Sequence, residues 1–221
     1  MSLSHYSLCL TGVLVRETLR FIHQRERFIA ALVRPLVWLL IFAVGFRSAL
    51  GVSIIPPYET YIPYEVYIVP GLIGMVQLFN GMQSSLSMVY DREMGSMRTL
   101  LVSPLPRWYL LVCKLIAGTL VSVLQVYAFL LIAAVFGFMN PLMGYIWLLP
   151  ALLIVGLMLG AFAMVLSSLI KQLENFAGIM NFVIFPMLFL SSALYPLWKI
   201  RESSYFIYQI CSLNPFNYAV E

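Results

Sequence analysis

Four polar residues recur at three- and four-residue spacing in an otherwise apolar stretch, namely Gln77, Asn80, Ser84 and Ser87. In an α-helix this spacing places them on one face, together with Gly81. In a membrane helix, such a polar stripe either lines a translocation path or a dimer interface, or it hydrogen-bonds to neighbouring helices of the same chain. The residues alone leave these alternatives open.

Charged residues gather directly after this stripe, in the segment 91–108 with the sequence DREMGSMRTLLVSPLPRW. The segment opens with Asp-Arg-Glu, continues through a Gly-Ser pair that permits a break, and closes with two prolines that fix the entry into the next helix. A loop needed only as a connection could be much shorter. We therefore interpret this segment as a small structured platform on the inner side of the membrane.

No catalytic constellation accompanies these residues. The sequence contains no Walker phosphate-binding loop, no His-Glu-x-x-His and no Gly-x-Ser-x-Gly motif. His5 and His23 lack metal-ligand spacing, and Cys9, Cys113 and Cys211 lie far apart. The predicted membrane helices hold no Asp or Glu, which argues against a proton-driven carrier. We expect no enzyme, no metal site and no cofactor bound by this chain, and an external source of energy.

The elements that position these residues are membrane helices. Of the 221 residues, 62% are hydrophobic and 10% are charged, and no Lys, Arg, Asp or Glu occurs between Leu115 and Ile170. A helical span needs about 20 apolar residues, so this stretch alone provides two spans. The net charge of +4 does not indicate nucleic acid, because the basic residues lie between apolar segments, where they set membrane orientation.

We predict an all-α fold, a single transmembrane domain over residues 1–221 that forms a polytopic helix bundle. Its five spans are expected at about residues 28–50, 66–90, 109–139, 145–170 and 176–195. An amphipathic helix over residues 10–27 is expected to lie in the headgroup layer, with its basic face toward anionic lipid or a partner. The tail, residues 196–221, is predicted to form short re-entrant or interfacial helices that break near Asn214-Pro215.

The orientation follows from the basic residues. With the N-terminus inside, ten Lys and Arg lie on the inner side and only Arg47, Lys199 and Arg201 lie outside. The 91–108 segment then faces the cytoplasm, and the tail lies outside it. Within the fourth span, Gly156-x-x-x-Gly160 is a close-approach motif that we expect to serve packing inside the chain.

The 91–108 segment resembles the inner loop of ABC exporter permeases of the type-2 class. The resemblance rests on Arg92-Glu93, Gly95-Ser96, Leu100-Leu101, Ser103-Pro104-Leu105-Pro106-Arg107 and Lys114. The Asn-Pro pair of the tail resembles a motif that precedes the last span of that family, and the amphipathic helix resembles its connecting helix. This chain has Arg98 where the family often has an acidic residue. The family usually has six spans, so we expect this chain to lack the last one.

The resemblance implies a function. In that family the loop is a coupling helix that fits a groove on the ATP-binding subunit. It implies that this chain is the membrane-spanning subunit of an ATP-driven exporter in a bacterial cytoplasmic (inner) membrane. Its partners would be a second copy of itself, membrane lipid and two ABC ATP-binding subunits, which would bind ATP and Mg. The coupling residues implied are Asp91, Arg92, Glu93, Gly95, Ser96, Arg98, Ser103, Pro104 and Arg107.

The substrate cannot be read from the residues. The spans are aromatic and hold no Asp or Glu, which slightly favours a small amphipathic or drug-like molecule. The alternatives are an exporter of a lipid-linked glycan and, from another class, a non-transporting membrane scaffold or assembly protein.

The predicted orientation can be tested by labelling single cysteines in a cysteine-free background. A membrane-impermeant thiol reagent should reach Gly95→Cys only from the cytoplasmic side and Thr60→Cys only from outside, because the positive-inside bias fixes both loops. The reverse pattern of labelling would overturn the topology.

Overall fold

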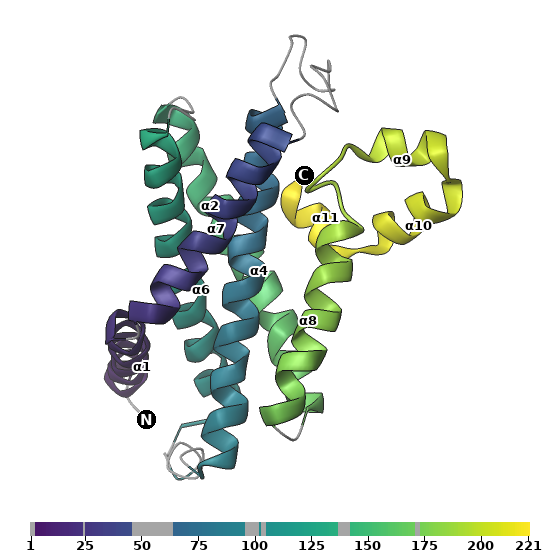
Figure 1. Ribbon diagram of the computed structural model, residues 1–221. Helices are drawn as coiled ribbons and strands as arrows, with labels where there is room; N and C mark the ends of the chain where they lie inside the picture. Colours follow the sequence, from purple (N-terminus) through teal and green to yellow (C-terminus); the bar gives the residue numbers. More distant parts are fainter. Residues whose placement is uncertain are drawn as a thin grey trace.

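Figure 1 shows a computed structural model, which describes residues 3–23, 25–45, 64–95, 102, 105–136, 142–170 and 173–221. Every regular element in these ranges is an α-helix, as the sequence predicts. The helices are α1 (Leu3–His23), α2 (Arg25–Gly45), α4 (Tyr64–Glu93), α6 (Arg107–Val135), α7 (Leu142–Leu169), α8 (Leu173–Phe189), α9 (Leu197–Ser203), α10 (Tyr205–Leu213) and α11 (Pro215–Val220).

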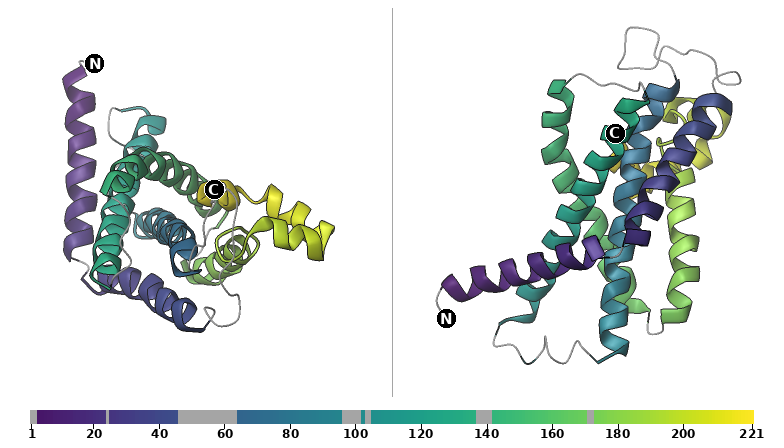
Figure 2. Two further views of the ribbon diagram at one scale, coloured as in Figure 1. Left: turned by 90° about the horizontal axis from the view of Figure 1, so that it is seen from above. Right: turned by 60° about the vertical axis from the view of Figure 1, so that its left-hand side comes forward.

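Helix α4 occupies the centre of the bundle. It packs against α2, α6, α7, α8 and α11, and the view along the bundle shows these neighbours around it (Figure 2, left). Its apolar residues Ile68, Leu72, Leu78 and Met82 are almost completely buried. A helix enclosed in this way must have small or hydrogen-bonded residues wherever a neighbour comes close, since only packing and hydrogen bonds hold helices together in lipid.

Helix α1 lies across the lower part of the bundle. Seen along the bundle, the central helices appear end-on whereas α1 lies lengthwise beside α6 (Figure 2, left). Its apolar residues Val15, Leu19 and Ile22 are exposed, and Phe21 is buried against the bundle. Helix α1 thus has exposed apolar residues, as an interfacial helix does, and its place in the headgroup layer stays a prediction.

Two helices of the described part are long and apolar enough to cross a membrane by themselves, α6 and residues Met143–Leu169 of α7. Two further apolar stretches, Phe28–Ile41 and Met180–Phe189, are shorter. Helix α4 has the length of a span, 30 residues, but its polar stripe lowers its mean hydropathy. Helices α2, α4, α6, α7 and α8 each begin within three residues of a predicted span, but α8 ends at Phe189, six residues before the predicted end of the fifth span. That these helices are five membrane spans stays a prediction.

The tail forms three short helices: α9 and α10 project to one side of the bundle, and α11 returns to pack against α4 and α8 (Figure 1). Asn214, at the predicted break, donates from Nδ2 to the carbonyl oxygens of Met187 and Leu190, both at 2.7 Å. Its Oδ1 accepts from the backbone N–H of Phe216 at 3.0 Å and caps α11. One asparagine therefore satisfies the open end of α8 and the start of α11 together.

The outer end of α4 is fixed to the same region. The hydroxyls of Tyr64 and Tyr67 donate to the carbonyl oxygens of Leu194 and Ser192 at 2.7 and 2.8 Å. A side chain at Gly71 would collide with the backbone of Ala193, so only glycine allows this approach. The inner end of α4 is described as far as Gly95, whose φ of 73° is the left-handed conformation that glycine adopts freely.

Candidate functional site

The polar stripe of α4 is buried within this chain. Gln77 is only 1% exposed, and its Nε2 donates to the carbonyl oxygen of Leu152 on α7 at 3.0 Å. Asn80 and Ser87 are also buried, and the Ser87 hydroxyl donates to the carbonyl oxygen of Ser84 at 2.6 Å. The stripe thus faces helices of its own chain. Its assignment to a translocation path or a dimer interface stays a prediction.

Glycines bring α4, α6 and α7 close together along this stripe. An added Cβ at Gly118 of α6 would lie 2.7 Å from Ser84 Oγ, and one at Gly156 of α7 would lie 3.0 Å from Gln77 Oε1. Gly81 of α4 approaches the backbone of Leu159 and Gly160. The prediction that Gly156 and Gly160 serve packing within the chain is therefore confirmed. We call this region the α4–α6–α7 seam.

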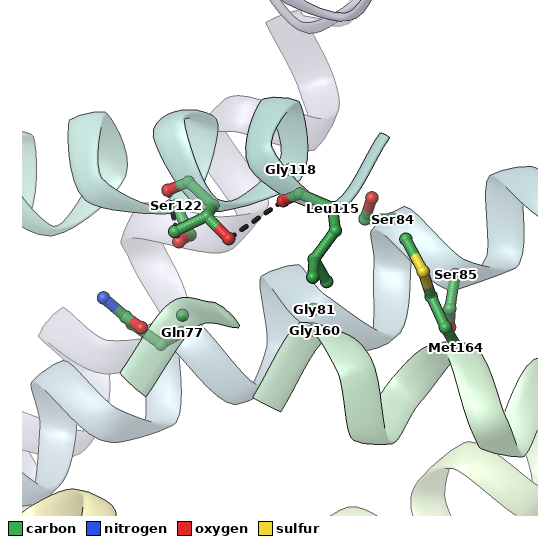
Figure 3. Close-up of a pocket in the computed structure, with 11 residues that line it drawn as sticks. Gln77, Gly81, Ser84, Ser85, Leu115, Gly118, Ser122, Gly160 and Met164 are labelled. Atoms are coloured by element: carbon green, nitrogen blue, oxygen red, sulfur yellow. Dashed lines mark hydrogen bonds between the residues drawn. The ribbon is translucent and has the colours of Figure 1, made fainter. Parts of the chain in front are cut away.

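The seam encloses little free space. Its cavity has a volume of about 10 Å³, which is near the minimum for one water molecule. Figure 3 shows Gln77, Ser84 and Ser122 lining it, with Gly81 and Gly160 at the closest approach of the helices. Gln77 Oε1 has no partner among the described residues. A single water bound there would satisfy that oxygen at little cost.

A larger cavity of about 360 Å³ lies at the outer end of the bundle, between α4, α7 and α11. Its walls are mainly apolar, with Ile73, Leu148 and Leu152 among them, and Gln77 supplies an amide at its lining. The volume is in the range of small-molecule pockets, which are mostly apolar with a few polar groups. Gln77 is thus the one stripe residue that lines both this cavity and the seam.

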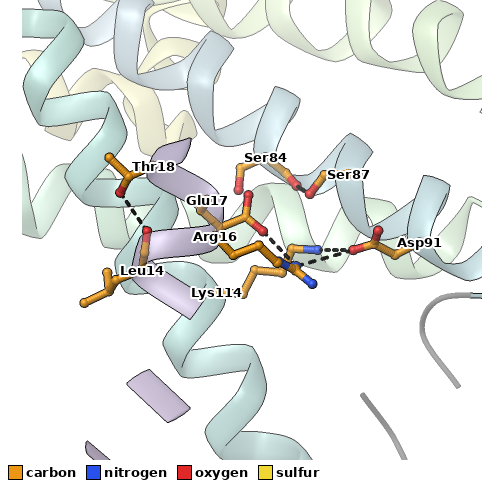
Figure 4. Close-up of polar contacts among 8 residues, drawn as sticks. All are labelled: Leu14, Arg16, Glu17, Thr18, Ser84, Ser87, Asp91 and Lys114. Carbon is orange, nitrogen blue, oxygen red and sulfur yellow. Dashed lines mark hydrogen bonds and ion pairs between the residues drawn. The ribbon is translucent and has the colours of Figure 1, made fainter. Parts of the chain in front are cut away.

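At the inner end, an ion cluster joins three helices. Lys114 Nζ of α6 donates to Asp91 Oδ2 of α4 at 3.0 Å. Arg16 of α1 lies 3.8 Å from the same oxygen and 2.9 Å from Glu17 Oε1. Figure 4 shows the four charged side chains meeting at this point. Asp91 is only 8% exposed, so it is a buried carboxylate that depends on its partners.

The surroundings of Asp91 set its charge. Burial alone raises the pKa of this carboxyl, but the hydrogen bond and charge of Lys114, with the charges of Arg16 and Arg20, outweigh burial, so the pKa is lowered from its ordinary value. Asp91 is therefore ionised at neutral pH. The sequence indicates only that Asp91 ends a membrane helix. It does not reveal this buried pairing.

The other coupling residues divide into four groups. Arg92 donates from Nη2 to the carbonyl oxygens of Ser167 and Ile170 and so fastens the end of α7 to α4. Glu93 and Arg107 are exposed at the two borders of the platform. Gly95 forms the turn described above, whereas Ser96, Arg98, Ser103 and Pro104 lie outside the described residues.

Sequence reasoning missed the part played by α1. The basic face of α1, which includes Arg16, was expected to face lipid or a partner, but Arg16 lies beside Asp91 and pairs with Glu17. One signal for the ion cluster was available in the sequence: Asp91 and Lys114 carry opposite charges at the inner ends of two neighbouring spans. They are 23 residues apart, and only the rotation of each helix about its axis decides whether they meet.

Comparisons with known proteins give one consistent result. A sequence model of the family described as "ABC-2 type transporter" matches residues 10–221. The chain is 29% identical over 195 residues to a putative transport permease ycf38 of Porphyra purpurea, and 27% identical over 214 residues to the ycf38 of Pyropia yezoensis. It is 29% identical over 164 residues to the probable multidrug ABC transporter permease YbhR of Escherichia coli K12.

The relatives are longer than this chain. The alignments cover 87%, 95% and 73% of this chain, in the same order, but only 64%, 70% and 43% of the relatives. No solved structure matches the chain.

The ion cluster makes a specific prediction for stability. Lys114→Met leaves the buried Asp91 carboxylate without its nearest partner and should lower the free energy of unfolding by about 3–5 kcal/mol. Adding Asp91→Asn should recover most of the loss, because the uncompensated charge is then removed. The matched control is Lys114→Arg, which keeps the charge. Denaturant unfolding in detergent measures all three variants.

The stabilisation that Asp91 provides should also depend on pH, which the same unfolding measurement can follow. Since the folded pKa of Asp91 is lowered, its stabilisation is present above the unfolded pKa of about 4 and is lost as the pH falls through the lower folded value. Asp91→Asn should remove that part of the acid sensitivity. Equal stability of the Lys114→Met protein and the unaltered chain would contradict the buried pair.

Proposed function

Because the chain belongs to the ABC-2 type transporter family, we propose that it is the membrane-spanning subunit of an ATP-driven exporter. It forms the translocation path together with a second copy of itself, and ATP and Mg bind to two separate ATP-binding subunits. The chain carries out no chemistry of its own. The spans number five, the N-terminus is cytoplasmic, and the membrane is the cytoplasmic membrane of a bacterium.

The observation that carries the proposal is the connectivity at the inner end. The platform begins where α4 ends and leads into α6, and its first residues are tied to the rest of the bundle. Asp91 is paired to α6 and lies beside Arg16 of α1, and Arg92 is bonded to the end of α7. A force applied to the platform by an ATP-binding subunit therefore reaches four helices through charged contacts.

These contacts suit a switch between two membrane arrangements. Rigid helices joined by a few specific bonds move as units, and small displacements at one end are carried along their length. In this account ATP binding draws the two platforms together, and the helices of each copy rock between inward- and outward-facing states. Export rather than uptake is proposed from the family alone.

The substrate we propose is a small amphipathic or drug-like molecule. Support comes from the mainly apolar walls of the 360 Å³ cavity, whose few polar residues include Gln77 and Glu221. The name of one relative, a probable multidrug permease, points the same way.

The coupling role can be tested with two matched double variants. Arg92→Ala with Glu93→Ala should lower the ATPase stimulation of the partner subunit at least about fivefold, the lower end of ordinary coupling energies of roughly 1–3 kcal/mol. Arg201→Ala with Glu202→Ala removes the same residue types from α9 on the other side of the fold and should leave stimulation unchanged.

Assembly must be measured beside activity, because Arg92 also holds α7. Size-exclusion chromatography of the complex should show that both double variants still bind the ATP-binding subunit. Unchanged stimulation in an assembled Arg92/Glu93 variant would remove the platform from the mechanism. A complex of the unaltered chain that neither stimulates ATPase nor transports would favour the membrane scaffold instead.

A further inference from the structure

A separate cavity lies against α1, and charged and polar side chains make up much of its lining. It has a volume of about 40 Å³ between α1, α4 and α6, which is room for about three water molecules. Arg20 and Glu17 line it from α1, and Asn80, Ser84 and Ser87 line it from α4. We call it the α1 cavity.

The α1 cavity contains an unused hydrogen-bond donor. Asn80 is 9% exposed, and its Nδ2 has no hydrogen-bond partner among the described residues. A buried amide left in this state is costly, and more so where lipid rather than water surrounds the helices. The neighbouring hydroxyl of Ser84 can also donate, whereas the Ser87 hydroxyl already donates to the Ser84 carbonyl oxygen and can only accept. The cavity is therefore equipped for a ligand that accepts hydrogen bonds.

The charges around the cavity do not balance. Arg16 pairs with Glu17, and Lys114 pairs with Asp91, so these four side chains cancel. Arg20 is half-buried and makes no ion pair with any described residue. One positive charge is thus left over at the lining of the cavity, where an anion would offset it.

The depth of the cavity agrees with the position of a lipid headgroup. Helix α1 crosses the lower part of the bundle, and α4 continues below it (Figure 1). The apolar side chains of Val15 and Leu19 on α1 are exposed, which places α1 at the boundary between acyl chains and headgroups. A phosphate in the α1 cavity would then lie where inner-leaflet phosphates are found.

We propose that the α1 cavity binds the phosphate group of an anionic ligand, with Arg20 supplying charge and the Asn80 amide and the Ser84 hydroxyl supplying donors. An inner-leaflet phospholipid is the favoured source, and free phosphate is the alternative source of the same chemistry. The Glu17 carboxylate also lines the cavity, but its charge is offset by Arg16 at 2.9 Å. This site goes beyond the proposed function, since it fastens α1 to the bundle whether or not the chain transports anything.

Native mass spectrometry of the delipidated full chain in detergent tests the site. The probes are dioleoylphosphatidylglycerol, dioleoylglycerol with the same tails but no phosphate, and inorganic phosphate. The unaltered chain should retain one phosphatidylglycerol in clear preference to dioleoylglycerol. Arg20→Gln and Asn80→Leu should each weaken that binding about tenfold, because charge-assisted hydrogen bonds to phosphate are lost.

The control for general charge attraction is Arg201→Gln, which removes an exposed arginine from α9 and should bind phosphatidylglycerol like the unaltered chain. Arg20→Gln should fold, since Arg20 makes no ion pair, and its melting temperature without lipid checks this.

Each possible result either supports the proposed phosphate site or overturns it. Tight binding of inorganic phosphate that Arg20→Gln abolishes supports the site with a soluble source. Equal retention of phosphatidylglycerol and dioleoylglycerol, or binding unchanged in both cavity variants, would overturn the proposal.

Discussion

Polar side chains inside a membrane bundle must find their partners within protein, and this constraint shapes the whole molecule. Helix α4 carries more polar residues than any other span, and it is the helix that all its neighbours enclose. Gln77 bonds to α7, Ser87 bonds within α4, and glycines on all three helices allow the approach that makes this burial possible. The seam therefore holds the bundle together and hides its polar groups at the same time.

The same constraint explains the inner end. A buried carboxylate in the last turn of α4 would be intolerable alone, and Lys114 and Arg16 compensate it. That compensation joins α1, α4 and α6 at the place where the platform begins. In the proposed function, stability and mechanism share residues, because the contacts that make Asp91 tolerable would also carry force from the platform into the membrane.

The sequence was a good guide to the helices and a poor guide to their contacts. The span positions follow from long apolar runs, and the break at Asn214-Pro215 follows from residue chemistry that acts locally. The pairing of Asp91 with Lys114 and the capping of α8 by Asn214 depend on how distant segments rotate and dock. The spacing of a polar stripe shows that its residues share one face of the helix, but not what that face contacts. For this reason the sequence left three interpretations open for Gln77 and Ser84.

The central claim is that the stripe is used inside one chain, and a designed disulfide tests it most directly. Ser84 Cβ lies 3.3 Å from the position of an added Cβ at Gly118, close to the 3.5–4.5 Å typical of disulfides. In a background without Cys9, Cys113 and Cys211, Ser84→Cys with Gly118→Cys should oxidise to an intrachain bond. The chain should then run as a monomer on a non-reducing gel, with no thiol left to label. A disulfide-linked dimer, or two free thiols after oxidation, would show instead that Ser84 does not face α6 of its own chain.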